Sequence, residues 1–409
     1  NYNTPAKIYA TQYLQIKDKT GRNIYSGYLF RKGQISPMPE LSVIIPVYNT
    51  AAYLRRCLDS VINQTMRDIE IILASDGPED CDAICREYAA EDSRIKLIER
   101  PGSYGAAVNR GIEQAQSDFI GIVETDDWIA PHMYEKLYQT ACETKADVVK
   151  ASFYFSHDND INTKAPDFQN PHKICNIRDY PAFLSYQASI WSAIYKKSFL
   201  QKQNIVLPEQ RLSFVDSPFH METFLKATRY AFINEPLYYY YQDNPGQSVK
   251  DDRHVTDIIA TNDFFLSRLD KTSRENYKPW IIQAVIDHLF WNFKRLSQNK
   301  AKNAFLQAAS QYIRKLNLKE KDLTRLDSYQ LIFLHGLRQN LSAKQISQKL
   351  IEKVRWIKLC GILPLVKIKE QSLSSRALLG GILPLYKITR KQHKTIIKLF
   401  NFIPICKKG

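Results

Sequence analysis

The sequence predicts an α/β protein with a mostly parallel central sheet. Between residues 40 and 155, short apolar segments alternate with amphipathic segments of helical length, which is the pattern of right-handed βαβ units. One apolar segment, residues 119–123, runs directly into the carboxylates of Glu124, Asp126 and Asp127. Open α/β sheets bind ligands at the carboxyl ends of their strands, so a site is expected there.

The first expected strand, residues 41–47, is mostly apolar and ends beside a proline. We expect Asn49 to cap the helix that follows, because apolar residues then recur three and four positions apart from Leu54 to Ile62. The later elements continue this alternation. Strands are expected at 69–74, 94–99, 119–123 and 147–155, and helices at 80–89, 106–116 and 131–144.

The acidic turn after residue 123 indicates a metal site. Three carboxylates within four positions repel one another, and a shared cation relieves this repulsion. Mg²⁺ and Mn²⁺ prefer oxygen ligands, often one or two carboxylates together with substrate phosphates. The alternative is a solvated turn in which Asp126 or Asp127 caps the next helix.

Five motifs, taken in order, resemble glycosyltransferase family 2. They are Pro46-Val47-Tyr48-Asn49, the segment 57–64, Ser75-Asp76-Gly77, the segment 109–112 and Glu124-Thr125-Asp126-Asp127. The resemblance is close over residues 40–155 and looser to about residue 250. It implies the Rossmann-like GT-A fold, an inverting mechanism, and a bacterial lipopolysaccharide or capsule type of enzyme.

The resemblance also assigns a nucleotide-sugar site. The residues assigned to it are Pro46, Val47, Tyr48, Asp76, Asn109, Arg110, Glu124, Thr125 and Asp126. Asp76 would accept a hydrogen bond from the uracil imide N–H, or else it is a turn residue. Arg110 would reach a phosphate, or else it is a solvated surface residue. Asp126 matches the position that holds Mn²⁺ or Mg²⁺, and Glu124, usually Asp in the family, contacts the metal, the ribose or a water.

Asp216 matches the family's catalytic base, which takes the proton of the acceptor hydroxyl. Phe214 and Phe219 flank it, and Val215 replaces a common Glu. Asp216 also reads as a helix N-cap, which is compatible with the catalytic role. We interpret His220 as structural.

Two further segments resemble the acceptor half of the family. Trp191 would stack on an acceptor sugar ring, or else it belongs to the core. The aromatic-rich segment 236–249 would close the catalytic domain near the acceptor, or else it is a last strand followed by a turn.

Composition limits the protein class. The chain has 409 residues, enough for one large domain plus an appendage. Its seven cysteines show no metal-knuckle spacing, which favours reduced thiols and a cytoplasmic setting. No signal peptide is visible, and no apolar run approaches the roughly 20 residues needed to span a bilayer. The P-loop, GxGxxG and HExxH motifs are absent from the sequence.

We divide the chain into four parts. They are an N-terminal extension or end of an upstream domain with a hairpin (1–37), a catalytic domain (38–250), a helical domain (251–340) and a basic tail (341–409). The catalytic domain comprises a nucleotide-sugar half, 38–155, and an acceptor half, 156–250.

The tail carries most of the net charge. Residues 341–409 hold 15 Lys and Arg residues against Glu352 and Glu370, a net +13 of the chain's +15. A Gly-Ile-Leu-Pro-Leu motif begins at residues 361 and 381, and a degenerate copy brings the prolines to a 20-residue period. Apolar insertion combined with attraction to anionic lipid predicts an interfacial anchor. A helical repeat packed on the body is the alternative, and the interleaved Ile, Leu and Pro argue against nucleic acid.

The expected function is metal-dependent, inverting transfer of a hexose or N-acetylhexosamine. The donor would be a UDP-sugar, and the acceptor a hydroxyl of a lipopolysaccharide, lipooligosaccharide or capsular glycan at the inner face of the cytoplasmic membrane. One alternative is a sugar nucleotidyltransferase, but residues 46–49 lack its Gly-rich basic loop. The other is a non-catalytic glycan- or membrane-binding relative, which Glu124 and Val215 keep open.

Overall fold

The computed structural model describes residues 10–17, 23–30, 35–158, 162–168, 171 and 173–352, and six strands between residues 356 and 408. The chain divides into two compact units. The first comprises Asn1–Arg295 with Lys321–Leu323, and the second comprises Leu296–Glu320 with Thr324–Gly409. This division falls inside the segment 251–340, for which the sequence predicted a single helical domain.

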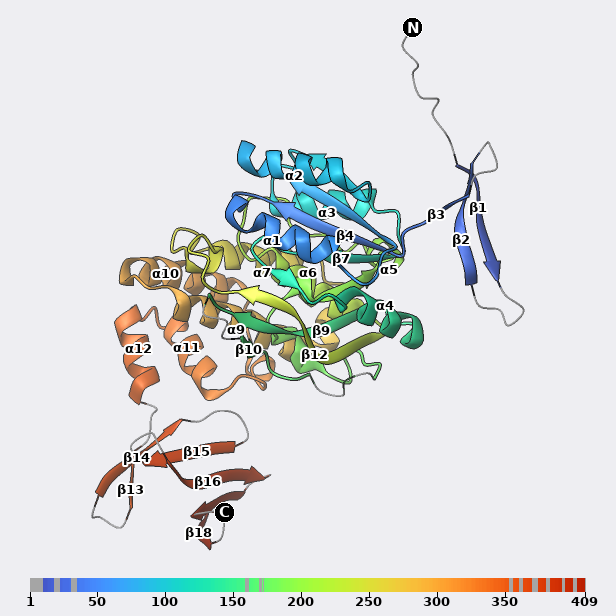
Figure 1. The fold of residues 1–409 in the computed structure, drawn as a ribbon. Helices are drawn as coiled ribbons and strands as arrows, with labels where there is room; N and C mark the ends of the chain where they lie inside the picture. Colours follow the sequence, from blue (N-terminus) through green and yellow to red (C-terminus); the bar gives the residue numbers. More distant parts are fainter. Residues whose placement is uncertain are drawn as a thin grey trace. The chain divides into compact units, whose positions relative to one another are not determined.

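Four parallel strands form one half of the main sheet (Figure 1). β4 (Leu41–Val47) lies between β5 (Ile69–Ser75) and β7 (Phe119–Ile122), and β6 (Ile95–Glu99) lies beside β5. Every residue of β4 and β5 is buried, because helices cover both faces of this half. The α/β alternation predicted for residues 40–155 is confirmed.

The helices of the first unit pack on the two faces of this sheet. One apolar cluster joins one face to α1 (Ala51–Ile62), α2 (Glu79–Glu91) and α4 (Met133–Thr144). A second cluster joins the other face to α3 (Tyr104–Gln114), α5 (Lys197–Lys202) and α6 (Asp216–Lys226).

The expected cap of α1 is wrong by one residue. Thr50 is the N-cap, and Asn49 adopts a left-handed conformation with φ of 51°. Asn tolerates this backbone region better than most residues do, so Asn49 serves the turn between β4 and α1. The Thr50 hydroxyl donates to Thr125 Oγ1 at 2.7 Å and so ties the start of α1 to the acidic turn.

The other half of the sheet is mixed. β11 (Ala193–Lys196) runs antiparallel to β7 and to β9 (Val148–Ser156), whereas β9 and β12 (Tyr230–Tyr241) are parallel. Two short strands pair antiparallel at this side: β8 (Trp128–Ile129) with β12, and β10 (Asn162–Lys164) with β9. The mostly parallel sheet predicted from the sequence therefore describes β4 to β7. Because β11 runs in the opposite direction, the rest of the sheet contains both parallel and antiparallel pairs.

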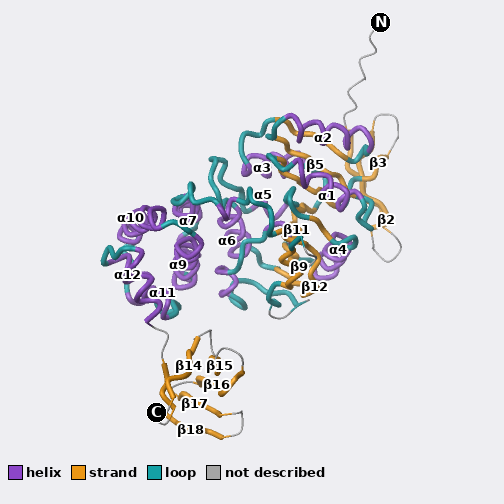
Figure 2. The backbone as a smooth tube through the Cα atoms, turned by 60° about the vertical axis from the view of Figure 1, so that its left-hand side comes forward, coloured by secondary structure: helices purple, strands orange, loops and turns teal. Residues whose placement is uncertain are grey.

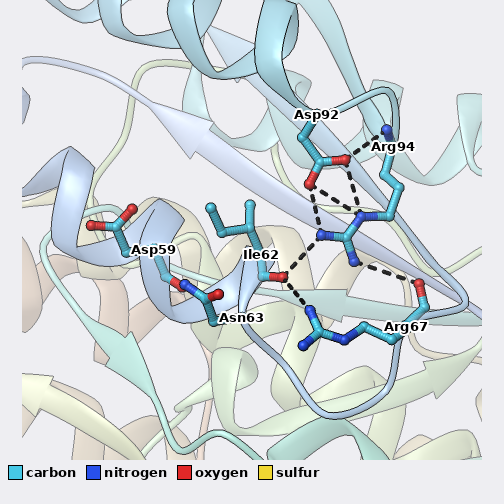
Figure 3. A network of polar contacts seen from close by, with 6 residues as sticks. All are labelled: Asp59, Ile62, Asn63, Arg67, Asp92 and Arg94. Carbon is cyan, nitrogen blue, oxygen red and sulfur yellow. Dashed lines mark hydrogen bonds and ion pairs between the residues drawn. The ribbon is translucent and has the colours of Figure 1, made fainter.

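Arginine side chains close the C-terminal end of α1 (Figure 3). Arg94 donates to the Ile62 carbonyl at 2.9 Å and to both carboxylate oxygens of Asp92, and Arg67 donates to the same Ile62 carbonyl at 3.2 Å. The last carbonyls of a helix have no partner within the helix, and cations near them are favourable. The network thus fixes the end of α1 to the turn before β6.

Helices follow β12, as predicted for residues 251–340. α7 (Asp257–Ser267), α8 (Lys271–Asn276) and α9 (Lys278–Arg295) belong to the first unit. The second unit contains α10 (Asn299–Lys315), α11 (Ser328–Arg338) and α12 (Ala343–Glu352), drawn as helices in Figure 2. No helix in the described part of the chain is long and apolar enough to cross a membrane.

Two further sheets involve the terminal segments. β1 (Ala10–Lys17) pairs antiparallel with β2 (Asn23–Phe30), which in turn pairs with β3 (Ile35–Pro37), so the predicted hairpin is confirmed. The tail forms an antiparallel meander rather than a helical repeat. Its strands are β13 (Trp356–Leu359), β14 (Leu363–Lys369), β15 (Ser374–Leu379), β16 (Leu383–Lys391), β17 (Lys394–Leu399) and β18 (Ile403–Lys408).

Candidate functional site

A cavity of about 580 Å³ lies at the carboxyl ends of β4, β5 and β7. The segments 210–216 and 244–249 form further parts of its wall. Most of the residues assigned to the site from the sequence line it. These are Pro46, Val47, Tyr48, Asp76, Glu124, Thr125, Asp126, Trp191 and Asp216.

Asp127 anchors the acidic turn to β12. It is fully buried and accepts hydrogen bonds from the Tyr238 hydroxyl and from the Tyr241 backbone N–H, both at 2.8 Å. Burial raises the pKa of Asp127 well above its usual value, and the charge of Asp126 adds to this effect. The N-cap of α4 is His132, so the alternative of a solvated, helix-capping turn is wrong.

Asp126 faces the cavity from this fixed turn. Its Oδ2 accepts a hydrogen bond from Asn244 Nδ2 at 2.9 Å, and burial raises the pKa of its carboxyl. Its backbone carbonyl accepts from Arg56 at 2.8 Å. The Arg56 guanidinium lies 3.9 Å from the ring centroid of Trp128, a cation–π contact that fixes its direction.

Glu124 is the second carboxylate of the turn in the cavity. The Tyr104 hydroxyl donates to its Oε1 at 2.5 Å. Burial raises the pKa of Glu124 to about 8; this hydrogen bond opposes the shift, and the charges of Asp126 and Asp216 add to it. In the absence of a cation, the site therefore holds a carboxyl that resists ionisation.

The acidic turn fits a divalent ion only when a ligand completes the coordination. Within the described residues, no cluster of three or more His, Cys, Asp or Glu side chains is arranged to hold a metal. Asp126 and Glu124 offer two carboxylates, and Mg²⁺ and Mn²⁺ are commonly held by one or two carboxylates and substrate phosphates. Two carboxylates alone do not complete the coordination sphere of such an ion.

The side of the cavity at β5 holds Asp76 and an arginine that the sequence did not reveal. The Asp76 backbone N–H donates to the Val47 carbonyl at 3.0 Å and so joins the ends of β4 and β5. Arg211 donates to the Gly102 carbonyl at 2.9 Å and lies 3.4 Å from Asp76 Oδ2. Arg211 was missed because it is far from Asp76 in the chain and lies in no recognised motif.

Asn109 and Arg110 are placed differently from the other assigned residues. The Asn109 amide donates to the Leu207 carbonyl at 3.0 Å and accepts from the Leu207 N–H at 3.0 Å. It thereby fixes the segment that leads to Arg211 and the cavity wall. Arg110 is exposed and donates to the Arg100 carbonyl at 3.3 Å.

Asp216 is the first residue of α6, and Val215 is the N-cap, so the predicted capping role of Asp216 is wrong. Burial raises the pKa of Asp216, and the backbone N–H groups of Asp216 and Ser217, followed by the charge of Lys150, oppose this shift. Phe219, one turn along α6, is fully buried. His220 is buried, its Nε2 donates to the Phe183 carbonyl at 3.1 Å, and burial lowers its pKa to about 3, all of which agrees with a structural role.

Trp191 lies at the boundary between core and cavity. Its side chain is only 5 % exposed and stacks on Tyr238, with ring centroids 4.1 Å apart. It also contacts Tyr240 and Phe153, yet it lines the cavity. The two interpretations of Trp191 are therefore compatible, because a ring held rigidly in the core presents a fixed apolar wall.

Comparison with known proteins shows that the chain is similar to glycosyltransferases. Residues 42–202 match the family described as Glycosyl transferase family 2. The uncharacterized glycosyltransferase EpsJ of Bacillus subtilis is 31% identical over 216 residues, covering 51% of this chain and 62% of EpsJ. The glycosyltransferase GlyG of Streptococcus pneumoniae is 32% identical over 215 residues, covering 49% of this chain and 70% of GlyG. The chain thus spans about three fifths of EpsJ's length.

A solved structure shares the fold. The crystal structure of S. aureus TarS 1-349 in complex with UDP-GlcNAc superposes with a TM-score of 0.62 at 16% identity, covering 83% of this chain and 97% of that chain. A second crystal structure of TarS 1-349, in complex with UDP, gives a TM-score of 0.60. At this identity the likeness concerns the fold alone.

Proposed function

Because the chain belongs to glycosyltransferase family 2 and has the GT-A fold, we propose that it transfers a hexose or N-acetylhexosamine from a UDP-sugar. The acceptor would be a hydroxyl of a bacterial surface glycan, such as lipopolysaccharide, lipooligosaccharide or capsule, and the configuration would invert. The observation that carries this proposal is a single cavity lined by Asp76, Asp126 and Asp216. In this proposal Asp76 recognises the uracil, Asp126 binds the metal ion, and Asp216 accepts the proton of the acceptor hydroxyl.

The donor is proposed to lie across the ends of β4, β5 and β7. Asp76 would accept a hydrogen bond from the uracil imide, with Pro46, Val47 and Tyr48 around the base and ribose. UDP is favoured over other nucleotides because TarS, which shares the fold, binds UDP and UDP-GlcNAc. Arg211, beside Asp76, lies within the same wall and adds a positive charge near the diphosphate.

Asp126, assisted by Glu124, would hold Mn²⁺ or Mg²⁺. The ion, when bound, supplies positive charge that stabilises the leaving diphosphate. Asn244 and Arg56 orient the turn through the Asp126 carboxylate and carbonyl. Asp216 would take the proton of the acceptor hydroxyl as that oxygen attacks the sugar, and its raised pKa brings it closer to the range of an effective general base.

The membrane is the proposed location of the acceptor. The tail combines Lys and Arg residues with repeated Ile-Leu-Pro segments, and each cation near an anionic surface contributes about 1 kcal/mol. We therefore propose that the enzyme lies at the inner face of the cytoplasmic membrane, where lipid-linked glycans would be extended.

A donor screen tests the proposal. The protein is incubated with Mn²⁺ and each common UDP-, GDP- and CMP-sugar, and the released nucleotide is measured with and without EDTA. We expect slow hydrolysis of one UDP-sugar that EDTA abolishes. Asp126→Ala should remove this activity while the melting temperature stays within about 2 °C. Asp216→Asn should keep UDP binding but stop turnover.

Asp118→Ala is the matched control. Asp118 is an exposed carboxylate that directly precedes the first residue of β7, whereas the cavity lies at the other end of this strand. It should leave turnover unchanged. Full activity of Asp126→Ala would remove the metal assignment, and full activity of Asp216→Asn would place the base elsewhere. If no donor turned over and UDP with Mn²⁺ gave no thermal stabilisation, the non-catalytic alternative would replace the transferase.

A further inference from the structure

A lysine lies buried in the centre of the sheet, and the reaction proposed above gives it no role. Lys150 is in β9, where it pairs with Ala193 of β11 and with Phe232 of β12, and it is 1 % exposed. Burying an ammonium group is costly unless it is paired and hydrogen-bonded. The partners of its Nζ therefore indicate what this position does.

The Lys150 ammonium donates to two carbonyls of the turn that carries Trp191. It contacts the carbonyl oxygens of Ser189 and, at 3.4 Å, of Ala188. Ser189 has φ of 20°, which is unusual for a residue with a side chain and requires support from its surroundings. The Ser189 carbonyl also accepts from the Ser192 N–H and hydroxyl. Lys150 thus holds the start of η2 (Ile190–Ser192), which presents Trp191 to the cavity.

The Lys150 side chain lies on the face of the sheet that α6 covers, because its cross-strand neighbours Ala193 and Phe232 belong to the same apolar cluster as Phe219 of α6. Burial raises the pKa of Asp216, and hydrogen bonds from the backbone N–H groups of Asp216 and Ser217, followed by the charge of Lys150, oppose this shift. Burial lowers the pKa of Lys150 itself to about 7. The neutral imidazole of His220 donates to a backbone carbonyl, so it offers no counter-charge. The acidic groups whose charges also couple to Asp216 are Tyr104 of α3, Glu124 of the acidic turn, Tyr195 of β11 and Tyr240 of β12.

We propose that Lys150 is a positioning residue for sugar transfer, which holds the turn bearing Trp191 and keeps a positive charge on the sheet face that α6 and its Asp216 cover. This inference rests on the proposed function, because it assigns Asp216 the role of base. A base must be ionised to accept a proton, and a partly buried carboxyl near other acids tends to stay protonated. An ammonium beside it favours the carboxylate.

The proposal predicts a particular pH profile. In the wild type, turnover rises with pH as Asp216 loses its proton, and it falls again above about pH 7 as Lys150 loses its own. Three substitutions separate the contributions. Lys150→Met removes charge and donor, Lys150→Gln retains a donor without charge, and Lys150→Arg retains a charge that does not titrate in this range.

The measurement is UDP release, between pH 5.5 and 9.5, from the UDP-sugar that the donor screen identifies. Lys150→Met and Lys150→Gln should move the acidic limb, which is the rise of turnover as Asp216 ionises, to higher pH, so that their loss of turnover is largest at low pH. Both should also lose the basic limb. Lys150→Arg should keep the acidic limb and lose only the basic one. The Kd for UDP should change less than about twofold in all three.

A loss of equal proportion at every pH in the Met and Gln variants would show a merely structural role and overturn the proposal. If the Met variant does not fold, the Arg variant tests the proposal. A fall of its turnover above about pH 7 would contradict the role assigned to Lys150, because arginine does not lose its proton in this range. A second readout needs no turnover. In protein labelled with ¹³C at Asp carboxyls, the resonance lost in Asp216→Asn should titrate at higher pH in Lys150→Gln. An unchanged titration overturns the inference, whereas absence of any donor turnover contradicts only the proposed function.

Discussion

At the residue scale, the three carboxylates of the acidic turn occupy three different environments. Asp127 is buried and accepts hydrogen bonds from the Tyr238 hydroxyl and the Tyr241 backbone N–H. Asp126 accepts from an asparagine at the cavity surface, and Glu124 accepts from the Tyr104 hydroxyl. The fixed position of Asp127 determines where the other two lie, because it anchors the turn at its end. A short acidic sequence thus contains one structural carboxylate and two that are available to a ligand.

The raised pKa of Glu124 predicts a pH-dependent cost to stability. In the folded protein this carboxyl keeps its proton up to about pH 8, whereas in the unfolded chain it ionises near its ordinary value of 4.5. The folded state therefore binds more protons between these values, and stability falls as pH rises through this window. Glu124→Gln should remove that loss while still accepting from Tyr104.

In metal-free buffer, we expect the Gln variant to melt at a higher temperature than the wild type at pH 8. From the size of the pKa shift the difference should be at most roughly 4 kcal/mol, or several °C, and it should vanish near pH 4.5. Thermal unfolding by circular dichroism measures this, with the exposed Glu91→Gln as the control that should show no such trend. A constant difference at all pH values would contradict the assignment.

The sequence identified the acidic turn but not the division of labour within it. Asp126 and Asp127 are adjacent and chemically identical, and their partners Asn244, Tyr238 and Tyr241 come from a strand and loop more than 100 residues later. Lys150 was missed for a related reason. Within an apolar strand, a single lysine looks like an edge or solvent-facing position until the pairing of β9 with β11 and β12 is known.

At the element scale, α3 serves as a rigid support for the wall of the cavity. An added Cβ at Gly105 would lie 1.9 Å from the Pro208 carbonyl oxygen, so the segment preceding Arg211 approaches the helix backbone directly. Asn109, one turn further along α3, binds both backbone groups of Leu207. The helix thereby fixes a segment that has no regular structure of its own.

Gly105→Ala should displace this segment. Because a backbone carbonyl lies in the way, the helix and segment must separate, at a cost of about 1–3 kcal/mol. We expect the affinity for UDP, measured by calorimetry with Mn²⁺, to fall roughly tenfold, which is about 1.4 kcal/mol. Glu113→Ala, an exposed change on the same helix, should alter neither affinity nor stability. An unchanged UDP affinity in the alanine variant would show that the segment does not position donor-binding groups.

The elements predicted best were those whose apolar pattern is local. The strands β4 to β7 and β9 follow from short apolar runs, the helices between them follow largely from period-3.6 patterns, and both are present in the structure. The direction of β11 could not be predicted from the sequence, because a four-residue strand contains no pattern that identifies the strands with which it pairs. The tail shows the same limit, because its apolar–basic alternation suits a helix or a strand over such short segments.

At the scale of the whole molecule, the packing within the second unit determines where the tail can be cut without disturbing the fold. α12 packs on α11, with Ile346 fully buried and in close contact with Gly336. A cut after residue 340 would remove α12 and expose this apolar contact. A cut after Glu352 keeps it and removes 13 of the 15 basic residues of the segment 341–409.

Truncation after Glu352 should abolish binding to anionic vesicles without affecting donor hydrolysis. We expect the full chain to sediment with vesicles of phosphatidylglycerol and phosphatidylcholine at low salt, and to be partly released by 0.5 M NaCl because exposed charges are screened. Vesicles of phosphatidylcholine alone are the control. Equal sedimentation of the full and truncated proteins would refute the anchor.

The four consecutive tyrosines of β12 have one further consequence. Tyr238 and Tyr240 contact Trp191, whereas Tyr239 and Tyr241 contact Trp128 on the other face of the sheet. Strand side chains alternate between faces, so shifting the register by one residue exchanges the two sets. Deleting any one of these tyrosines leaves the same protein sequence whichever one is removed, yet it moves the residues on one side of the deletion to the opposite face. The number of consecutive tyrosines therefore determines which residues of β12 face each side of the sheet, even though the four residues are chemically identical.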